Sequence, residues 1–385
     1  MKPLAMRDFD PRDREPVLEI WRDAFLGDDA EPSEEWFCLP GARLFVWERE
    51  GEICATARVH EFQASRGEAR LSCGGLAVVA VALPVRRTGV GAQVVRECLS
   101  WMRAERFLLS SLYAFREGWY RSLGYEVCGR RWKVTVPASG LPSVETALTV
   151  REVSADDWRL LEPCHGAWIR RYSGMNPRTE ERWNKVLVPA GKPHTILAAG
   201  DPVEVYVVLR STGEFSGEQV ISEAVWATPA GYRSFLDILA KVGMNRSRIS
   251  WYEPPDLPYL VEHFDADVGV CLARPIMFRV NDVPGALRSL RPDAEGEFTV
   301  EVMDAALPEN RGPWAVRFKP GEVDVTAAAS AEIALDIRAF SQALLGQPSL
   351  RALASAGRVA SWSESALGAA AALMPESEVY CLEFF

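Results

Sequence analysis

The clearest chemistry in the sequence lies where an apolar run meets a turn of arginines and glycines. Leu76–Ala82 is uncharged, and Arg86-Arg87-Thr88-Gly89-Val90-Gly91 follows shortly after it. A helix is expected to begin at this turn, with one apolar face formed by Val90, Val94, Val95, Cys98, Leu99 and Met102. The first turn of a helix presents unpaired N–H groups and the positive end of the helix dipole, which both suit a pyrophosphate. The sequence therefore predicts a phosphate site between a buried strand and a helix.

The residues of this turn have different expected tasks. Gly89 and Gly91 let the backbone approach a phosphate without a Cβ in between. Arg86 and Arg87 add positive charge nearby, and the preceding strand offers its own N–H groups to a ligand. An R-x-x-G-x-G pattern also occurs in ordinary strand-to-helix crossovers, so an ordinary glycine turn is the alternative at this point.

The composition limits the kinds of partner. The chain has 385 residues, a formal net charge of −10 and eight scattered cysteines. This length predicts two or three domains. Nucleic acid is disfavoured as a partner, because phosphate binding needs a basic face. Cysteines and histidines do not cluster at metal-site spacing, so no metal is expected, and the isolated histidines are expected to be structural or exposed.

The sequence also predicts a cytoplasmic protein without a membrane partner. Its first ten residues lack the apolar core of a signal peptide. The longest uncharged apolar run, Gly74–Val85, is shorter than the roughly 20 residues that span a bilayer.

Three stretches of different character predict three domains, at residues 1–137, 145–285 and 286–385. The linker after the first is Ala138–Ser143, which is rich in turn-forming residues. The first two stretches begin alike: Met6-Arg7-Asp8 precedes a helical pattern at Pro16–Phe25, and Val150-Arg151-Glu152 precedes one at Ala155–Arg171. This suggests duplication of one fold, with chance similarity as the alternative. Further strands are expected at Glu204–Leu209, Gly296–Met303, Trp314–Phe318, Val323–Thr326 and Val379–Leu382, and a further helix at Gly231–Val242.

The segment after the predicted phosphate site completes a recognisable order of elements. Leu108–Leu112 is a predicted strand, and a short helix with the sequence Trp119-Tyr120-Arg121-Ser122-Leu123-Gly124-Tyr125 follows it. This order resembles the GNAT superfamily of N-acetyltransferases, and Y-R-x-x-G-Y is similar to the enhanced intracellular survival (Eis-like) family within it. The resemblance covers nearly the whole chain. It implies an α/β (α+β) architecture of tandem GNAT folds, each a mixed twisted sheet flanked by helices, followed by a sterol-carrier-protein-like α+β domain.

The resemblance also implies which part does what. Residues 1–137 would be the catalytic GNAT domain, and residues 145–285 a degenerate copy, because no R-x-x-G-x-G occurs there. In the third stretch, Ala331–Asp336 followed by Leu344-Leu345-Gly346 is similar to the carrier-like fold. Acetyl-CoA would be the co-substrate, held by Val79, Val81, Arg86, Arg87, Thr88, Gly89, Val90 and Gly91, with the N–H of Val79 or Val81 facing the oxyanion.

The resemblance implies direct attack of an amine on the thioester, without a nucleophilic cysteine or serine. Tyr120 would be the general acid, and the terminal carboxylate of Phe385 the general base. Tyr125 would be structural. The alternatives are that Tyr120 is only a packed aromatic residue, and that the terminal residues Phe384 and Phe385 only provide hydrophobic closure of the sheet.

The acceptor is the least determined part of the resemblance. Phe25, Trp36, Tyr113 and Glu383 are the candidate acceptor-lining residues, near the acidic stretch 28–35. Aromatic faces and carboxylates suit a small cationic amine, such as an aminoglycoside or polyamine, or a lysine side chain. Leu83 and Thr88 depart from the family pattern, and Thr88 removes one positive charge near the phosphates. A homo-hexamer is implied by resemblance alone. The rival functions are acetylation of one dedicated metabolite and a catalytically silent acyl-CoA or lipid-binding module.

Overall fold

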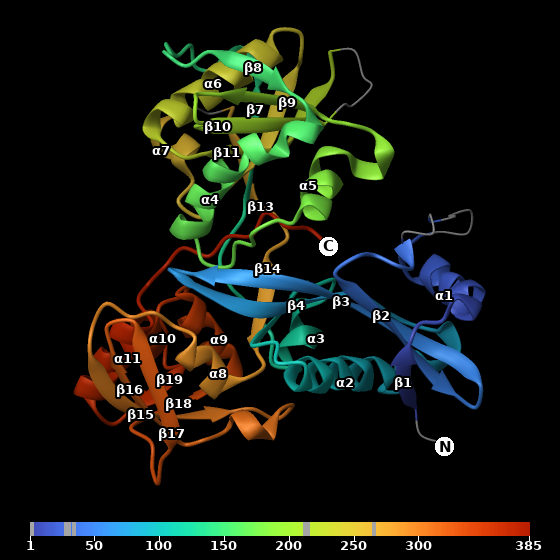
Figure 1. Cartoon of the computed structure of the whole chain (residues 1–385), viewed down its shortest axis with the longest axis vertical. Coiled ribbons are helices and arrows are strands. Elements are labelled where there is room, and N and C mark those ends of the chain that lie inside the picture. Colours follow the sequence, from blue (N-terminus) through green and yellow to red (C-terminus); the bar gives the residue numbers. More distant parts are fainter. Residues whose placement is uncertain (1–3, 27–31, 33–35, 211–215, 264–266) are drawn as a thin grey trace.

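The computed structural model describes residues 4–26, 32, 36–210, 216–263 and 267–385. Within these residues the chain forms three sheets, which we call the first, second and third sheet in order along the chain. Figure 1 shows one lobe around each sheet, with the C-terminus where the lobes meet. No helix in the described part of the chain is long and apolar enough to cross a membrane.

The first sheet has the strand order β1-β2-β3-β4-β5-β14-β6. Its strands are β1 (Ala5–Asp8), β2 (Ala42–Arg49), β3 (Glu52–Arg66), β4 (Ala69–Val81), β5 (Leu109–Tyr113), β6 (Glu126–Val127) and β14 (Ile276–Val280). Only β4 and β5 run parallel, joined by helix α2 (Val90–Ala104), and their pairing ends at Gly75 and Ser111.

Two helices cover opposite faces of the first sheet. All six apolar residues predicted on α2 are buried, as expected for an amphipathic helix, and they pack on Ala55, Ala57 and Val59 of β3. On the other face lies α1 (Arg14–Trp21), which continues as a π-helical turn, η2 (Arg22–Leu26), and packs on Val46 and Ala80. A short helix, α3 (Glu117–Arg121), follows β5.

The second sheet repeats this topology, with the order β8-β9-β10-β11-β12-β7-β13. Its strands are β7 (Trp132–Pro137), β8 (Val150–Val153), β9 (Thr195–Ala199), β10 (Val205–Arg210), β11 (Glu218–Trp226), β12 (Arg248–Glu253) and β13 (Gly269–Leu272). Its parallel pair is β11 and β12, and α6 (Pro229–Gly243) connects them as α2 connects β4 and β5. Its other helices are α4 (Glu162–Arg171), α5 (Glu180–Leu187) and α7 (Pro258–Glu262). The repeated topology supports the duplication that the two similar beginnings suggested.

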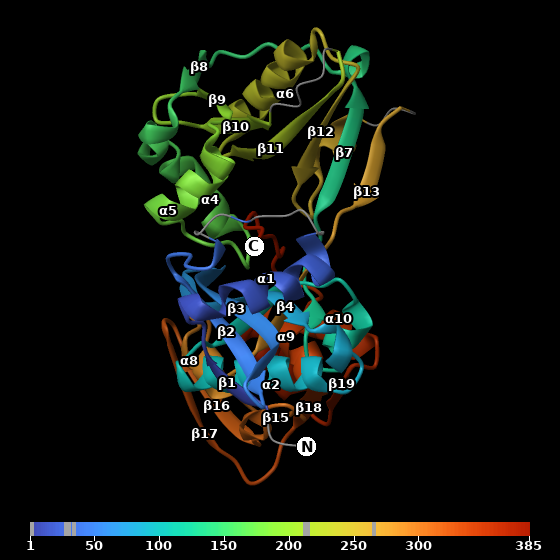
Figure 2. The same cartoon turned by 90° about the vertical axis from the view of Figure 1, so that its right-hand side faces the viewer.

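The two sheets exchange one strand each. β7 pairs with β12 in the second sheet, and β14 pairs with β5 in the first, so each strand takes the same place in the other unit's sheet. The chain therefore passes between the two units twice, and Figure 2 shows β7 and β13 side by side at the edge of the upper lobe. Strand pairing thus crosses the domain limits expected at residues 137 and 285.

The third sheet has the order β17-β16-β15-β18-β19. Its strands are β15 (Gly296–Met303), β16 (Trp314–Lys319), β17 (Glu322–Ala327), β18 (Ile333–Asp336) and β19 (Val359–Ser361), and its helices are α8 (Val283–Arg288), α9 (Ile337–Leu345), α10 (Leu350–Ser355) and α11 (Glu364–Leu373). Helix α9 packs on β14, and a buried ion pair of 2.7 Å between Arg279 and Asp304 also joins this unit to the first sheet.

Two predicted elements differ in the structure. The helix predicted over Ala155–Arg171 is divided into a 3-10 segment, η6 (Ala155–Leu160), and α4, because Pro163 can occupy only the first turn of a helix. The strand predicted at Val379–Leu382 is an extended segment with one isolated bridge, between Val379 and Ser173. This segment runs between the units rather than along the edge of a sheet, so it has no continuous partner strand.

Candidate active site

Strand β4 has a free edge next to β5. The two strands pair through Cys73, Gly74 and Gly75, but β4 continues to Val81 without β5 beside it. Its ladder with β3 is also irregular. Ala77 and Ala80 are three residues apart on β4, but their partners on β3, Arg58 and Thr56, are only two residues apart. The extra residue makes a β-bulge at this point, which bends the strand and directs its backbone groups outward.

The bulge is strained and is held by side chains. Val78 has a φ of 52°, which is costly for a β-branched residue. Its carbonyl accepts a hydrogen bond of 3.0 Å from the Thr56 hydroxyl, which in turn accepts one of 2.9 Å from Trp21 Nε1. Strain that is fixed in this way is typical of functional sites.

The free edge presents backbone N–H groups. The N–H of Ala82 donates to Cys54 O on β3 at 2.8 Å. Because successive peptide groups of a strand point to opposite edges, the N–H groups of Val81 and Val79 point away from β3, toward the gap left by β5. Arg86 Nε donates to Val81 O at 2.8 Å, so the carbonyl of Val81, like its N–H, points away from β3. An extended amide chain can pair with this edge as a strand would.

The N-terminus of α2 is open. Gly89 occupies the N-cap with a φ of 92°, and no side chain caps the helix. Thr88 donates to Val85 O at 2.7 Å, which shapes the turn, while Arg87 is exposed. Val90 is buried in the core, so it can contribute only its N–H to a ligand. The uncapped N–H groups and the nearby guanidinium groups suit a pyrophosphate, and with the free strand edge they fit acetyl-CoA.

The corresponding helix of the second sheet is closed instead. The hydroxyl of Thr228 accepts a hydrogen bond of 2.9 Å from Gly231 N at the start of α6, and Pro229 fills the first turn. The carboxylate of Glu204 accepts a hydrogen bond from the same Thr228 hydroxyl, so it places a negative charge at this terminus. A side-chain cap and a carboxylate together disfavour a phosphate here.

Tyr120 lies in an aromatic cluster beside β5. Its side chain is buried, and its ring makes edge contacts with Phe115, Trp119 and Tyr125. Burial raises the pKa of its phenol above the ordinary value, so the hydroxyl is protonated at neutral pH. Tyr125 is fully buried and shares a 2.6 Å hydrogen bond with Ser110, which agrees with a structural role.

The C-terminal residue reaches the place where β4 and β5 separate. The Phe385 ring lies 4.8 Å from the Phe62 ring and 5.6 Å from that of His60. A Cβ added at Gly75 would come within 2.8 Å of the Phe385 ring, so this ring rests on the last paired residue of β4. Tyr113 donates to Glu383 O at 2.8 Å, which fixes the end of the chain to β5. Phe384 is 63% exposed, with its ring 4.9 Å from that of Tyr113, whereas the Phe385 ring packs inward.

Glu383 faces the second unit. Its carboxylate accepts a 2.5 Å hydrogen bond from Arg178, which also binds Glu223 on β11 through two hydrogen bonds of 2.7 and 2.6 Å. All three side chains are buried. The structure therefore places Glu383 in an ion-pair network rather than among the acceptor-facing aromatic residues, and any contact with an amine stays a prediction.

The two aromatic residues expected at the acceptor side lie near α1. Phe25 is 48% exposed with its ring 6.2 Å from that of Trp21, and Trp36 is 43% exposed. The carbonyl of Trp36 accepts a hydrogen bond from Arg58. The acidic residues of the stretch 28–35 lie outside the described residues.

Sequence reasoning missed Arg58, His60 and Phe62, which alternate along β3 and point to the face that carries Phe385. Their signal was present, because a buried strand with arginine and histidine at alternate positions presents polar groups to one face. Sequence reasoning also missed Arg182, which donates to His60 Nδ1 at 3.2 Å from α5 of the second unit. No local pattern connects these two residues.

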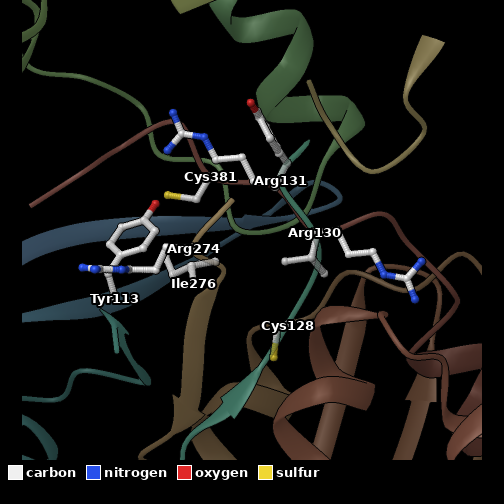
Figure 3. A pocket seen from close by; sticks show the side chains of 9 residues that line it. Tyr113, Cys128, Arg130, Arg131, Arg274, Ile276 and Cys381 are labelled. Atoms are coloured by element: carbon white, nitrogen blue, oxygen red, sulfur yellow. The ribbon is translucent and has the colours of Figure 1, made fainter. Parts of the chain in front are cut away.

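A small cavity lies behind the C-terminal segment. Its volume is about 10 Å³, and Tyr113, Arg131, Tyr380 and Cys381 are among its lining residues. Figure 3 shows the Tyr113 hydroxyl directed toward Cys381, while Arg130 points away from both. This volume is room for about one water molecule, so the cavity cannot hold an amine acceptor.

Comparisons with known proteins agree with this arrangement. Residues 5–128 match the acetyltransferase (GNAT) domain, and residues 283–382 match the sterol carrier protein domain. An uncharacterized N-acetyltransferase of Streptomyces avermitilis is 25% identical over 90% of this chain and 91% of its own length. Another, from Streptomyces coelicolor, is 27% identical over 82% of each chain.

Solved structures show the same fold over the whole chain. A GCN5-related N-acetyltransferase from Kribbella flavida has a TM-score of 0.84 and 24% identity, with 100% of this chain and 98% of that chain covered. Eis1 from Mycobacterium abscessus has a TM-score of 0.78 and 20% identity, with both chains fully covered. The chain thus has an acetyltransferase (GNAT) domain at residues 5–128, a second GNAT-like fold after it and a sterol carrier protein domain at residues 283–382, and its relatives support N-acetyltransferase function.

Proposed function

We propose that this protein is an Eis-like, acetyl-CoA-dependent enzyme that acetylates a primary amine by direct attack within a ternary complex. One observation supports it above all. The free edge of β4, the open N-terminus of α2, the Tyr120 cluster and the Phe385 ring all adjoin the place where β4 and β5 separate. Of these, the free strand edge can hold the pantetheine arm of the co-substrate and the open helix terminus its phosphates, while Tyr120 and Phe385 lie close to the thioester end.

Each bond change in the reaction has a candidate group. The amine nitrogen attacks the thioester carbonyl carbon, a C–N bond forms, and the oxyanion accepts a hydrogen bond from the N–H of Val79 or Val81. The terminal carboxylate of Phe385 takes the proton that the amine loses, directly or through water. The C–S bond then breaks, and Tyr120 gives its proton to the departing sulfur. The products are an N-acetylated amine and the CoA thiol.

The buried position of Tyr120 is compatible with this role. Burial raises the pKa of the phenol, but it also disfavours a bare thiolate in the same place, since desolvation penalises every charged form. Proton transfer from the phenol to the sulfur therefore removes a poorly solvated negative charge at the moment it develops.

The primary test is thiol release from acetyl-CoA by the full-length protein with aminoglycosides, polyamines and lysine peptides as acceptors. Turnover on several of these amines is the expected result. Bound acetyl-CoA with no thiol release on any amine would refute the enzyme and favour the acyl-CoA-binding module. Turnover on one amine only would favour the dedicated enzyme.

A second test concerns the base. Two alanines added after Phe385 move the terminal carboxylate away from the place where the natural chain ends, so kcat should fall while acetyl-CoA binding is unchanged. Normal kcat in the extended chain would exclude the terminal carboxylate as the base.

A further inference from the structure

Three cationic side chains, Arg58, Arg182 and Lys185, lie near His60, whose ring packs against that of Phe385 at the end of the chain. Arg182 of α5 lies 4.3 Å above the Phe62 ring, against which Phe385 also packs. Burial, together with the positive charges of Arg182, Arg58 and Lys185, lowers the pKa of His60 to about 2. His60 is therefore neutral at physiological pH, and the three longer side chains carry the charge.

These cations cannot serve the phosphates of acetyl-CoA. Side chains alternate along a strand, and Val59 packs beneath α2, so Arg58 and His60 point to the opposite face. That face also holds Trp21, whose ring lies 5.6 Å from the Arg58 guanidinium. Arg58 lies opposite Ala77, directly before the bulge of β4. The positive charge is thus on the acceptor side of the site.

Among the described residues, no carboxylate forms an ion pair with Arg58, Arg182 or Lys185. Glu383, the nearby acid, is bound by Arg178. Arg58 is 3% exposed, and a buried guanidinium without an anion is costly. An anionic ligand would remove this cost.

We propose that Arg58, Arg182 and Lys185 bind an anionic group of the acceptor, so that the substrate is an amine that also carries a carboxylate or a phosphate. Amino acids are the simplest compounds of this class. The inference rests on the proposed acetyl transfer, and it differs from the cationic acceptors that the sequence alone suggested. Guanidinium groups suit both anions, because their planar N–H donors bind two oxygens at once.

Matched acceptor pairs test the inference in the full-length enzyme with acetyl-CoA. Glycine is compared with glycinamide, β-alanine with its amide, and phosphoethanolamine with ethanolamine. The expected kcat/KM of the anionic member is higher by on the order of 10- to 100-fold, the range of one to two charge-assisted hydrogen bonds. The third pair distinguishes phosphate from carboxylate.

Charge-removing variants show whether these residues cause the preference. Arg182 is half-buried and Lys185 is exposed. Arg182→Gln and Lys185→Met should each reduce the ratio within each pair several-fold, mainly through KM of the anionic member. Arg58→Gln should do the same, but its buried position makes folding a concern, so the two α5 variants decide. Arg70→Gln, an exposed arginine of β4, is the control and should leave the ratio unchanged.

Three outcomes would overturn the inference. Equal or better turnover of the uncharged members would leave acetyl transfer standing but exclude an anion subsite. A loss in Arg182→Gln that is the same for both members of a pair would mean that the cations only position the terminal carboxylate. Calorimetry with CoA present should show binding of N-acetylglycine but not of N-acetylglycinamide. Binding of neither compound would also overturn the inference. Binding of N-acetylglycine alone, without turnover of any acceptor, would support the anion subsite but refute the proposed acetyl transfer.

Discussion

The substitution Tyr120→Phe isolates the proposed general acid, because it removes one oxygen and keeps the ring. The ring contacts with Phe115, Trp119 and Tyr125 remain, and within the described residues no group forms a hydrogen bond with the Tyr120 hydroxyl. The fold and its stability should therefore be nearly unchanged. General acid catalysis contributes roughly 10²- to 10⁴-fold, so kcat should fall by at least about 100-fold, which corresponds to about 2.7 kcal/mol.

The neighbouring tyrosine provides a matched control. Tyr125→Phe breaks the 2.6 Å hydrogen bond with Ser110 in a fully buried place, which should cost about 1–2 kcal/mol of unfolding free energy. It touches no proposed step of the reaction, so kcat should stay within a few-fold of the wild-type value. One tyrosine thus affects turnover and the other stability.

The assay is single-turnover thiol release, because slow product release could otherwise conceal a loss in the chemical step. Urea unfolding of both variants gives the stability comparison. Burial raises the pKa of Tyr120, so the wild-type rate should not decline through deprotonation of this residue as the pH rises through its ordinary value of about 10. A Tyr120→Phe enzyme with more than a third of the wild-type rate would refute the role, as would equal losses in both variants.

Further predictions concern the turn, the end of the chain and pH. Gly89→Val forces a β-branched residue to a φ of 92° and should weaken acetyl-CoA binding at least 10-fold. The control Gly321→Val has a similar φ of 76° in an exposed turn and should lower stability only. Calorimetry measures the binding of acetyl-CoA, and thermal unfolding measures the stability of both variants. Glu383→Ala removes the 2.5 Å bond to Arg178 and should cost about 1.5–3 kcal/mol and lower kcat, with KM for acetyl-CoA unchanged; unaltered kcat would mean that this network does not position the terminus. The lowered pKa of His60 means that the folded state binds fewer protons than the unfolded state below about pH 6.5. His60→Gln should therefore reduce the loss of stability on acidification by up to about 1.4 kcal/mol per pH unit, and urea unfolding at pH 6.5 and 5 checks this.

The features that the sequence predicted well are local. The apolar face of α2 follows from helical spacing, and the Gly89 turn follows from its position between a strand and a helix, so both were visible in a window of about 20 residues. The fold class was also predictable, because the order of elements from the β4 region to Tyr125 resembles the GNAT superfamily.

The features that the sequence did not predict depend on distant partners. β7 and β14 pair outside the units in which they were expected, and strand pairing is decided by edges that lie over a hundred residues away. The polar groups around Phe385 have the same origin, since Arg182 and His60 are 122 residues apart in the chain. Only the three-dimensional structure brings such residues together.

The two GNAT-like units differ at corresponding places of their sheets. In the first, β4 and β5 separate around a free edge; in the second, the corresponding place beside β11 holds Glu223, Arg178 and the side chain of Glu383. A buried guanidinium between two carboxylates fixes the C-terminal segment there, because breaking either pair leaves an uncompensated charge. The helix terminus that could bind a phosphate is capped by Thr228 in the same unit. In the described part of the second unit the α6 terminus is thus closed to a phosphate, and buried side chains of this unit hold the segment that ends at Phe385. A substitution deep in the second unit, at Arg178, should therefore impair turnover at an active site to which it contributes no reacting atom.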